Sequence, residues 1–192
     1  MRAPDTTIRE MIERAIELAR RYAVWWQLVN KTSFAVNEAV VNDHEDFFAT
    51  TTQALFESFI VITYQLYERR RDTISIPSLI ADLPESDEDL AKKLDSKVDS
   101  IKPQLVKAFA IRCGVYAHRS KKEAPETIFS AMGLSAAEMK KVVDVTTEII
   151  ARLASAAAIG RKEEIVNEIW QRGTYAGDDT FLLMGALREH AL

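Results

Sequence analysis

Apolar residues recur at steps of three and four along almost the whole chain, which is the spacing of one buried helix face. The series Ile8, Ile12, Ile16 and Ala19 shows the pattern most clearly. No segment of useful length alternates apolar and polar residues as a half-buried strand does. This periodicity predicts an all-α fold.

Three helices are expected in the first part of the chain. The first runs from Thr6 or Thr7 to about Asn30, and the second covers 31–42. The third, 44–69, carries aromatic and aliphatic residues that point all round its axis, which is typical of a buried helix. We expect this third helix to be the central and most buried one.

Proline and capping residues set the later boundaries. Pro77 is placed to open a short helix. Pro103 removes a backbone donor, so one helix should end and the next should begin near Ile101. Ser135 begins a capping box that opens a helix ending at Gly160.

The chain has 192 residues, of which 47% are hydrophobic, so it is long enough for one well-filled core and short for two. We expect one helical bundle over 1–160. Residues 161–192 should form an extension of two short helices, 161–171 and 180–191, joined by a glycine-containing link. The extension is expected to pack on the bundle or on a dimer partner.

The composition argues against several classes of protein. Cys113 is the single cysteine, so no intrachain disulfide forms and a reducing compartment suits the chain. The N-terminus leads into a charged helix, unlike a signal peptide, and no segment approaches the roughly 18 uninterrupted apolar residues of a membrane span. We expect a soluble cytoplasmic protein. Without ligand-spaced His or Cys pairs and without a glycine-rich phosphate loop, neither a metal nor a cofactor is expected.

Basic residues concentrate in one segment, although the net charge of the chain is −4. Residues 92–122 hold nine basic side chains against two acidic ones, a net +7 that leaves −11 for the rest. Such a segment attracts an anionic ligand, and it is equally compatible with a solvated helix face. Trp25 and Trp26 are expected to divide between core and an interface, with stacking on nucleobases as the alternative.

Arg112 and His118 are the residues best suited to chemistry. Arg112 follows Leu105 and Phe109 on an apolar helix stripe, where a guanidinium must meet an anion, carbonyl groups or trapped water. A fixed cation and a titratable imidazole are what phosphodiester cleavage without a metal needs. The two lie about 120° apart on a regular helix, so their convergence requires a loosened turn at Gly114, a position of His118 at the frayed helix end, or a second subunit that supplies the missing half. The alternative is structural: an arginine held by a carboxylate and a hydrogen-bonded core histidine.

The run from Arg112 to His118, near a helix end in an all-helical chain, resembles the HEPN superfamily (higher eukaryotes and prokaryotes nucleotide-binding domain). That signature is Arg, four to six residues, then His, and here the interval is five. The aromatic-rich helix ending near Tyr67 and the closing residues 117–120 resemble the abortive-infection U-type branch. The resemblance covers about residues 8–155.

The resemblance implies an antiparallel helical bundle that dimerises so that two Arg/His pairs face one cleft, as in metal-independent ribonucleases. By position, His118 would act as general base or acid, and Arg112 would hold the phosphate. The neighbouring basic residues taken as candidate RNA contacts are Lys107, Arg119, Lys121 and Lys122.

We therefore expect a homodimeric endoribonuclease that cuts single-stranded RNA in phage defence or a toxin–antitoxin pair, with an antitoxin or a nucleotidyltransferase as a further partner. Cys113 stands where many active members carry Asn or Asp. The alternative is accordingly a non-catalytic HEPN-like module that binds RNA, a nucleotide or a protein. A helical dimer with a role in assembly alone is the third hypothesis.

Overall fold

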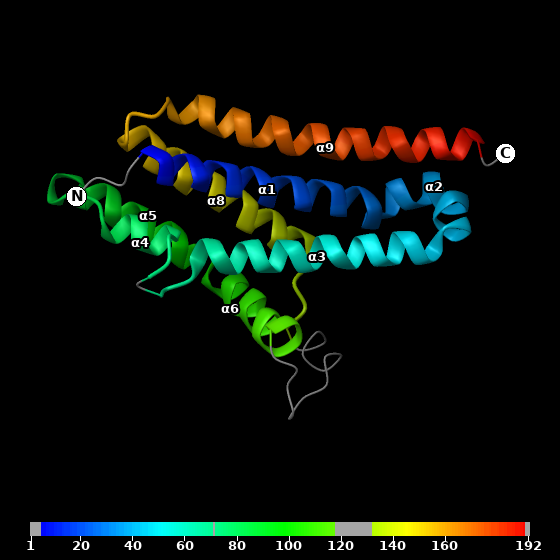
Figure 1. Cartoon of the computed structure of the whole chain (residues 1–192), viewed down its shortest axis with the longest axis horizontal. Helices are drawn as coiled ribbons and strands as arrows, with labels where there is room; N and C mark the ends of the chain where they lie inside the picture. The colour runs from blue at the N-terminus through cyan, green and yellow to red at the C-terminus, as the bar shows by residue number, and fades with distance from the viewer. Residues whose placement is uncertain (1–4, 71, 118–131, 191–192) are drawn as a thin grey trace.

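The computed structural model describes residues 5–70, 72–117 and 132–190, and within these ranges it contains helices, turns and no strand (Figure 1). The expected all-α class is confirmed for this part of the chain. The helices are α1 (Asp5–Val29), α2 (Lys31–Asp43), α3 (Glu45–Tyr67), α4 (Ile76–Ala81), the 3₁₀ turn η1 (Glu85–Asp87), α5 (Glu88–Ser100), α6 (Lys102–Ile111), the π-helical segment η2 (Arg112–Ala117), α8 (Ala136–Ala156) and α9 (Lys162–His190). Among the described residues, no helix has the length and apolar character needed to cross a bilayer.

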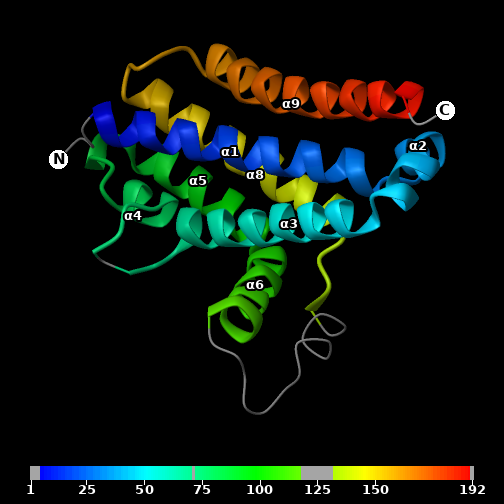
Figure 2. The same ribbon diagram turned by 45° about the vertical axis from the view of Figure 1, so that its right-hand side comes forward.

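Helix α1 lies at the centre of the packing, because it contacts α2, α3, α8 and α9 (Figure 2). Its apolar stripe, from Ile8 through Ile16 to Ala19, is buried as the spacing predicts. The expectation that α3 is the central, most buried helix is wrong. Buried residues of α3 gather mainly in its second half, and Phe47 near its start is 64% exposed. Val61 of α3 is also exposed, and Ala49 and Phe56 line a surface groove, so the apolar residues of this helix do not all face the core.

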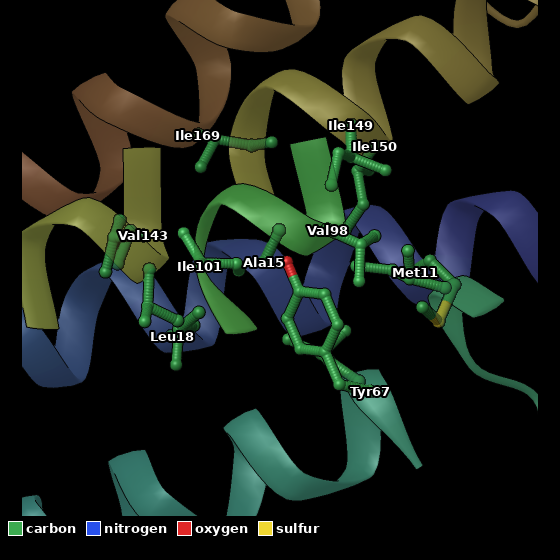
Figure 3. Packing of buried hydrophobic residues seen from close by; sticks show 14 of the residues in the cluster. Met11, Ala15, Leu18, Tyr67, Val98, Ile101, Val143, Ile149, Ile150 and Ile169 are labelled. Atoms are coloured by element: carbon green, nitrogen blue, oxygen red, sulfur yellow. The ribbon is translucent and has the colours of Figure 1, made fainter. Parts of the chain in front are cut away.

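One cluster of buried residues joins α1 to α3, α4, α5, α6, α8 and α9. Tyr67 points from α3 into this cluster (Figure 3), and its hydroxyl lies 2.8 Å from the Thr146 Oγ1 atom of α8. Burial raises the pKa of Tyr67, so the phenol stays neutral at any ordinary pH. This buried hydrogen bond fixes α3 against α8.

The boundaries at prolines and caps follow the sequence. Helix α5 ends at Ser100 and α6 begins at Lys102, so the restart expected at Pro103 is confirmed. The Ser75 side chain caps α4, whose first turn holds the expected proline. Ser135 caps α8 through the expected capping box.

The end of α8 differs from the prediction. The helix stops at Ala156, and Gly160 is not its cap. Instead Ala158 adopts the left-handed conformation, with φ of 59°. A glycine, Gly160, is the residue that the sequence predicts for this left-handed position, because glycine reaches the conformation without strain. In the structure Ala158 takes the position instead.

Two short C-terminal helices were also expected, and this is wrong, because α9 continues unbroken through Gly173 and Gly177. A Cβ atom on Gly173 would lie 3.1 Å from the Cβ atom of Ala19 on α1. The glycine is therefore needed for close helix contact. It costs roughly 1 kcal/mol of helix propensity, which the packing of α9 on α1 offsets.

This packing predicts opposite effects for two glycine substitutions in α9. Gly185 has open space where a Cβ would stand, so Gly185→Ala should raise the free energy of unfolding by up to about 1 kcal/mol. Gly173→Ala should show no gain or a loss, because the new Cβ crowds Ala19. Equilibrium urea denaturation measures both. Equal gains in the two variants would contradict the close approach of α9 to α1.

Candidate functional site

The first six residues of the Arg112–His118 motif form the π-helical segment η2, which continues α6. A π-helix bonds residue i to i+5, so its turn is wider than an α-turn, and such segments occur frequently at functional sites. Gly114 lies inside it, where the sequence called for a loosened turn. His118 and three of the candidate RNA contacts, Arg119, Lys121 and Lys122, lie outside the described residues.

Arg112 packs against α3. Its guanidinium Cζ atom lies 4.3 Å from the centroid of the Tyr64 ring, which is within the range of a cation–π contact. The Tyr64 ring in turn contacts Phe109 edge to face at 5.0 Å, and its hydroxyl donates a 3.0 Å hydrogen bond to Glu68. The Tyr64 ring thus positions the guanidinium, and the ring itself is held by its contact with Phe109 and by the hydrogen bond of its hydroxyl to Glu68.

Arg112 is half-buried, and no carboxylate of the described residues forms an ion pair with it. The Glu68 carboxylate, at the C-cap of α3, accepts a hydrogen bond from Tyr64 and lies 3.9 Å from the Nε atom of Arg70. The hydrogen bond to Glu68 is the main cause of the raised pKa of Tyr64, and the positive charge of Arg112 opposes it. Within the described structure, no ion pair compensates the positive charge of this guanidinium, so the charge is available to an anion.

Tyr116 lies four residues beyond Arg112 on η2 and is half-buried. Burial and then the charge of Glu57 raise the pKa of Tyr116 to about 12, so its phenol is neutral. Together with Trp25 of α1 and Phe56 of α3, it lines a groove of about 700 Å³. The motif segment therefore has a cation at its start and an aromatic groove near its end.

The basic residues before the motif are largely paired within the protein. The Lys107 Nζ atom lies 2.7 Å from Glu138 and donates a 3.2 Å hydrogen bond to the Gly133 carbonyl. Lys97 forms a 2.6 Å ion pair with Glu148. The candidate RNA contact Lys107 thus holds α6 to α8, and these pairs reduce the field that the charge count alone suggests.

The family model for HEPN_AbiU2, described as AbiU2, matches residues 5–172. The protein belongs to the AbiU2 family of HEPN proteins. The resemblance seen in the sequence over about 8–155 is therefore confirmed, and the match extends it into the first turns of α9. No curated protein and no solved structure matches the chain.

The sequence of this AbiU2 protein did not single out Tyr64, which the structure places against Arg112. A local signal existed, since Tyr64 and Glu68 are four residues apart and so lie on one face of a helix. The contact between Arg112 and Tyr64 depends on how two separate helical segments pack, so no local pattern predicts it.

In the described ranges, no group of three or more His, Cys, Asp or Glu side chains is arranged to hold a metal ion.

The Lys107–Glu138 pair predicts a pH effect. The hydrogen bond from Lys107, followed by that from the Ser135 backbone, lowers the pKa of Glu138 from 4.5 to about 2. A lowered carboxyl pKa stabilises the fold above the unfolded-state value and loses this contribution as pH falls through the folded-state value. Glu138→Gln keeps a capping side chain and removes the charge.

We expect wild type to exceed Glu138→Gln in free energy of unfolding by roughly 1 kcal/mol at neutral pH. The difference should shrink between about pH 4.5 and pH 2. Urea titrations at several pH values measure it. A difference that stays constant down to pH 2 would show that the pair contributes nothing through charge.

Proposed function

We propose that this AbiU2-family chain is a metal-independent endoribonuclease that cleaves single-stranded RNA in abortive infection or a toxin–antitoxin pair, under the control of an antitoxin or nucleotidyltransferase. The observation that carries the proposal is the state of Arg112. It is half-buried, oriented by Tyr64 and without a carboxylate partner in the described part of the chain. A guanidinium in this state is suited to grip a phosphate.

In the proposed reaction, the ribose 2′ oxygen attacks the adjacent phosphorus and the bond from phosphorus to the 5′ oxygen breaks. The products are a 2′,3′-cyclic phosphate and a 5′ hydroxyl, so neither water nor an electron is consumed. His118 transfers the proton at the 2′ or the 5′ oxygen, and Arg112 balances the charge that grows on the phosphate. One imidazole cannot begin the step as both base and acid, so a homodimer that contributes two copies of His118 fits this chemistry.

Removal of either motif side chain should abolish cleavage. In EDTA, Arg112→Ala and His118→Ala are each expected to lower the rate on the order of 100-fold or more, because the lost groups act on the transition state. Arg161→Ala is the matched control, since Arg161 is exposed and pairs with Glu164 away from the motif. Gel assays of labelled RNA measure the rates. Wild-type rates in both motif variants would exclude the assignment.

Tyr64 should act as a positioning residue through its ring. Tyr64→Phe keeps the aromatic face under Arg112 and should retain most of the activity. Tyr64→Leu removes that face, and a loss of about fivefold in kcat/KM is expected from about 1 kcal/mol of cation–π interaction. Thermal melting checks that both variants remain folded. Equal activity of the two folded variants would mean that the ring does not orient Arg112.

A second candidate function is a non-catalytic HEPN-like module that binds RNA, a nucleotide or a protein. Cys113 favours it, because an exposed thiol stands directly after Arg112 in place of the amide or carboxylate common in active members. Salt-sensitive RNA binding without cleavage products would select this candidate.

A further inference from the structure

The groove beside Tyr116 is a feature that the proposed reaction does not use. It lies between the end of α1, α2 and the first half of α3, with a volume of about 700 Å³. Trp25, Phe56 and Tyr116 are only half-buried, so each leaves part of its ring at the groove surface. The rings of Trp25 and Phe56 are 6.3 Å apart and tilted by 41°. Three aromatic rings from three elements thus surround one open space.

The groove adjoins the cation of the motif along α3. Arg112 lies over Tyr64, while Phe56, eight residues earlier on the same helix, reaches the groove. Eight residues correspond to about 12 Å of helix. Arg112 and Tyr116 are also only four residues apart on η2. One or two nucleotides bridge such a distance, so a phosphate at Arg112 brings a neighbouring base to the groove.

The polar side chains of the groove indicate which group it accepts. Asn42 and Gln53 carry amides that donate and accept, and Glu45 carries a carboxylate that only accepts. A carboxylate repels a phosphate and pairs with an exocyclic amino group, as in recognition of cytosine. The groove therefore suits a neutral base that bears an amino group, with its face against the aromatic rings.

We propose that this groove binds an unpaired nucleobase of the RNA next to the phosphate at Arg112, and that it favours adenine, cytosine or guanine over uracil. The inference rests on the proposed function, since it specifies the substrate of the same site. Stacking on aromatic side chains supplies most of the affinity, and the Glu45 carboxylate, which accepts from an exocyclic amino group, distinguishes these bases from uracil.

Binding is measured without cleavage by use of 2′-O-methyl hexamers of A, C or U, in which the attacking hydroxyl is blocked. Ala49 is exposed and lines the groove, so Ala49→Phe fills the space without removal of a contact. Ala54 is exposed on the same helix and does not line the groove, so Ala54→Phe is the matched control.

By fluorescence anisotropy with the full chain, the A and C hexamers should bind the wild type more tightly than the U hexamer. Ala49→Phe should weaken binding of the A hexamer on the order of tenfold, the size expected for one lost stacked base. Ala54→Phe should leave it unchanged.

Trp25 supplies a local readout, because the chain has three tryptophans. With Trp26→Phe and Trp170→Phe combined, Trp25 is the remaining one, and the A hexamer should quench its fluorescence. No quenching in a variant that still binds the hexamer would overturn the groove as the binding site.

The other outcomes separate this inference from the proposed function. Binding that falls in Arg112→Ala and is unaffected by Ala49→Phe overturns the groove and leaves the nuclease intact. Loss of binding in Ala49→Phe, with no cleavage of ordinary RNA in EDTA, supports the groove and contradicts the nuclease. Failure of all three hexamers to bind contradicts both. Loss of self-association in Ala49→Phe with unchanged RNA affinity would show that a second copy of the chain occupies the groove.

Discussion

The stack of Arg112 on Tyr64 is the interaction on which the proposed chemistry depends. A cation–π contact holds a guanidinium with about 0.5–2 kcal/mol and leaves its charge intact. A carboxylate would also hold it, and would cancel that charge. Lys107 illustrates the contrast one turn earlier, because Glu138 engages it in an ion pair. Orientation by a neutral ring is what allows a half-buried cation to remain available to a phosphate.

The fold supports this interaction through α3. Most of its buried residues lie in its C-terminal half, and the Tyr67–Thr146 hydrogen bond fixes this half against α8, one turn from Tyr64. Figures 1 and 2 show α6 on one side of the α1 and α3 pair and α9 on the other. The close contact of Gly173 with Ala19 therefore holds α1 on the side opposite α6 (Figures 1 and 2).

Local signals in the sequence predicted much of this structure. Helix periodicity gave the all-α class, Pro103 gave the break between α5 and α6, and Ser135 gave the start of α8. The continuity of α9 was missed, since glycine weakens an isolated helix and only the contact with Ala19 explains Gly173. The burial of α3 was overestimated because periodicity cannot tell a core face from a groove.

The site, like the fold, was predictable only where a local pattern in the sequence encodes it. Arg112 was identified because a permanent charge interrupts an apolar stripe, which is a property of one helix. Its contact with Tyr64 joins two elements that are far apart in the chain, and no local pattern encodes it. The pairing of Lys107 with Glu138 is likewise tertiary, so a count of charges overstated the basic field.

The chemical identity of the RNA ends made by the purified protein in EDTA tests the central claim most directly. Attack by the 2′ oxygen with Arg112 on the phosphate predicts 2′,3′-cyclic phosphate and 5′-hydroxyl ends by mass spectrometry. Products with 3′-hydroxyl and 5′-phosphate ends, formed only when a divalent metal is added, would contradict it.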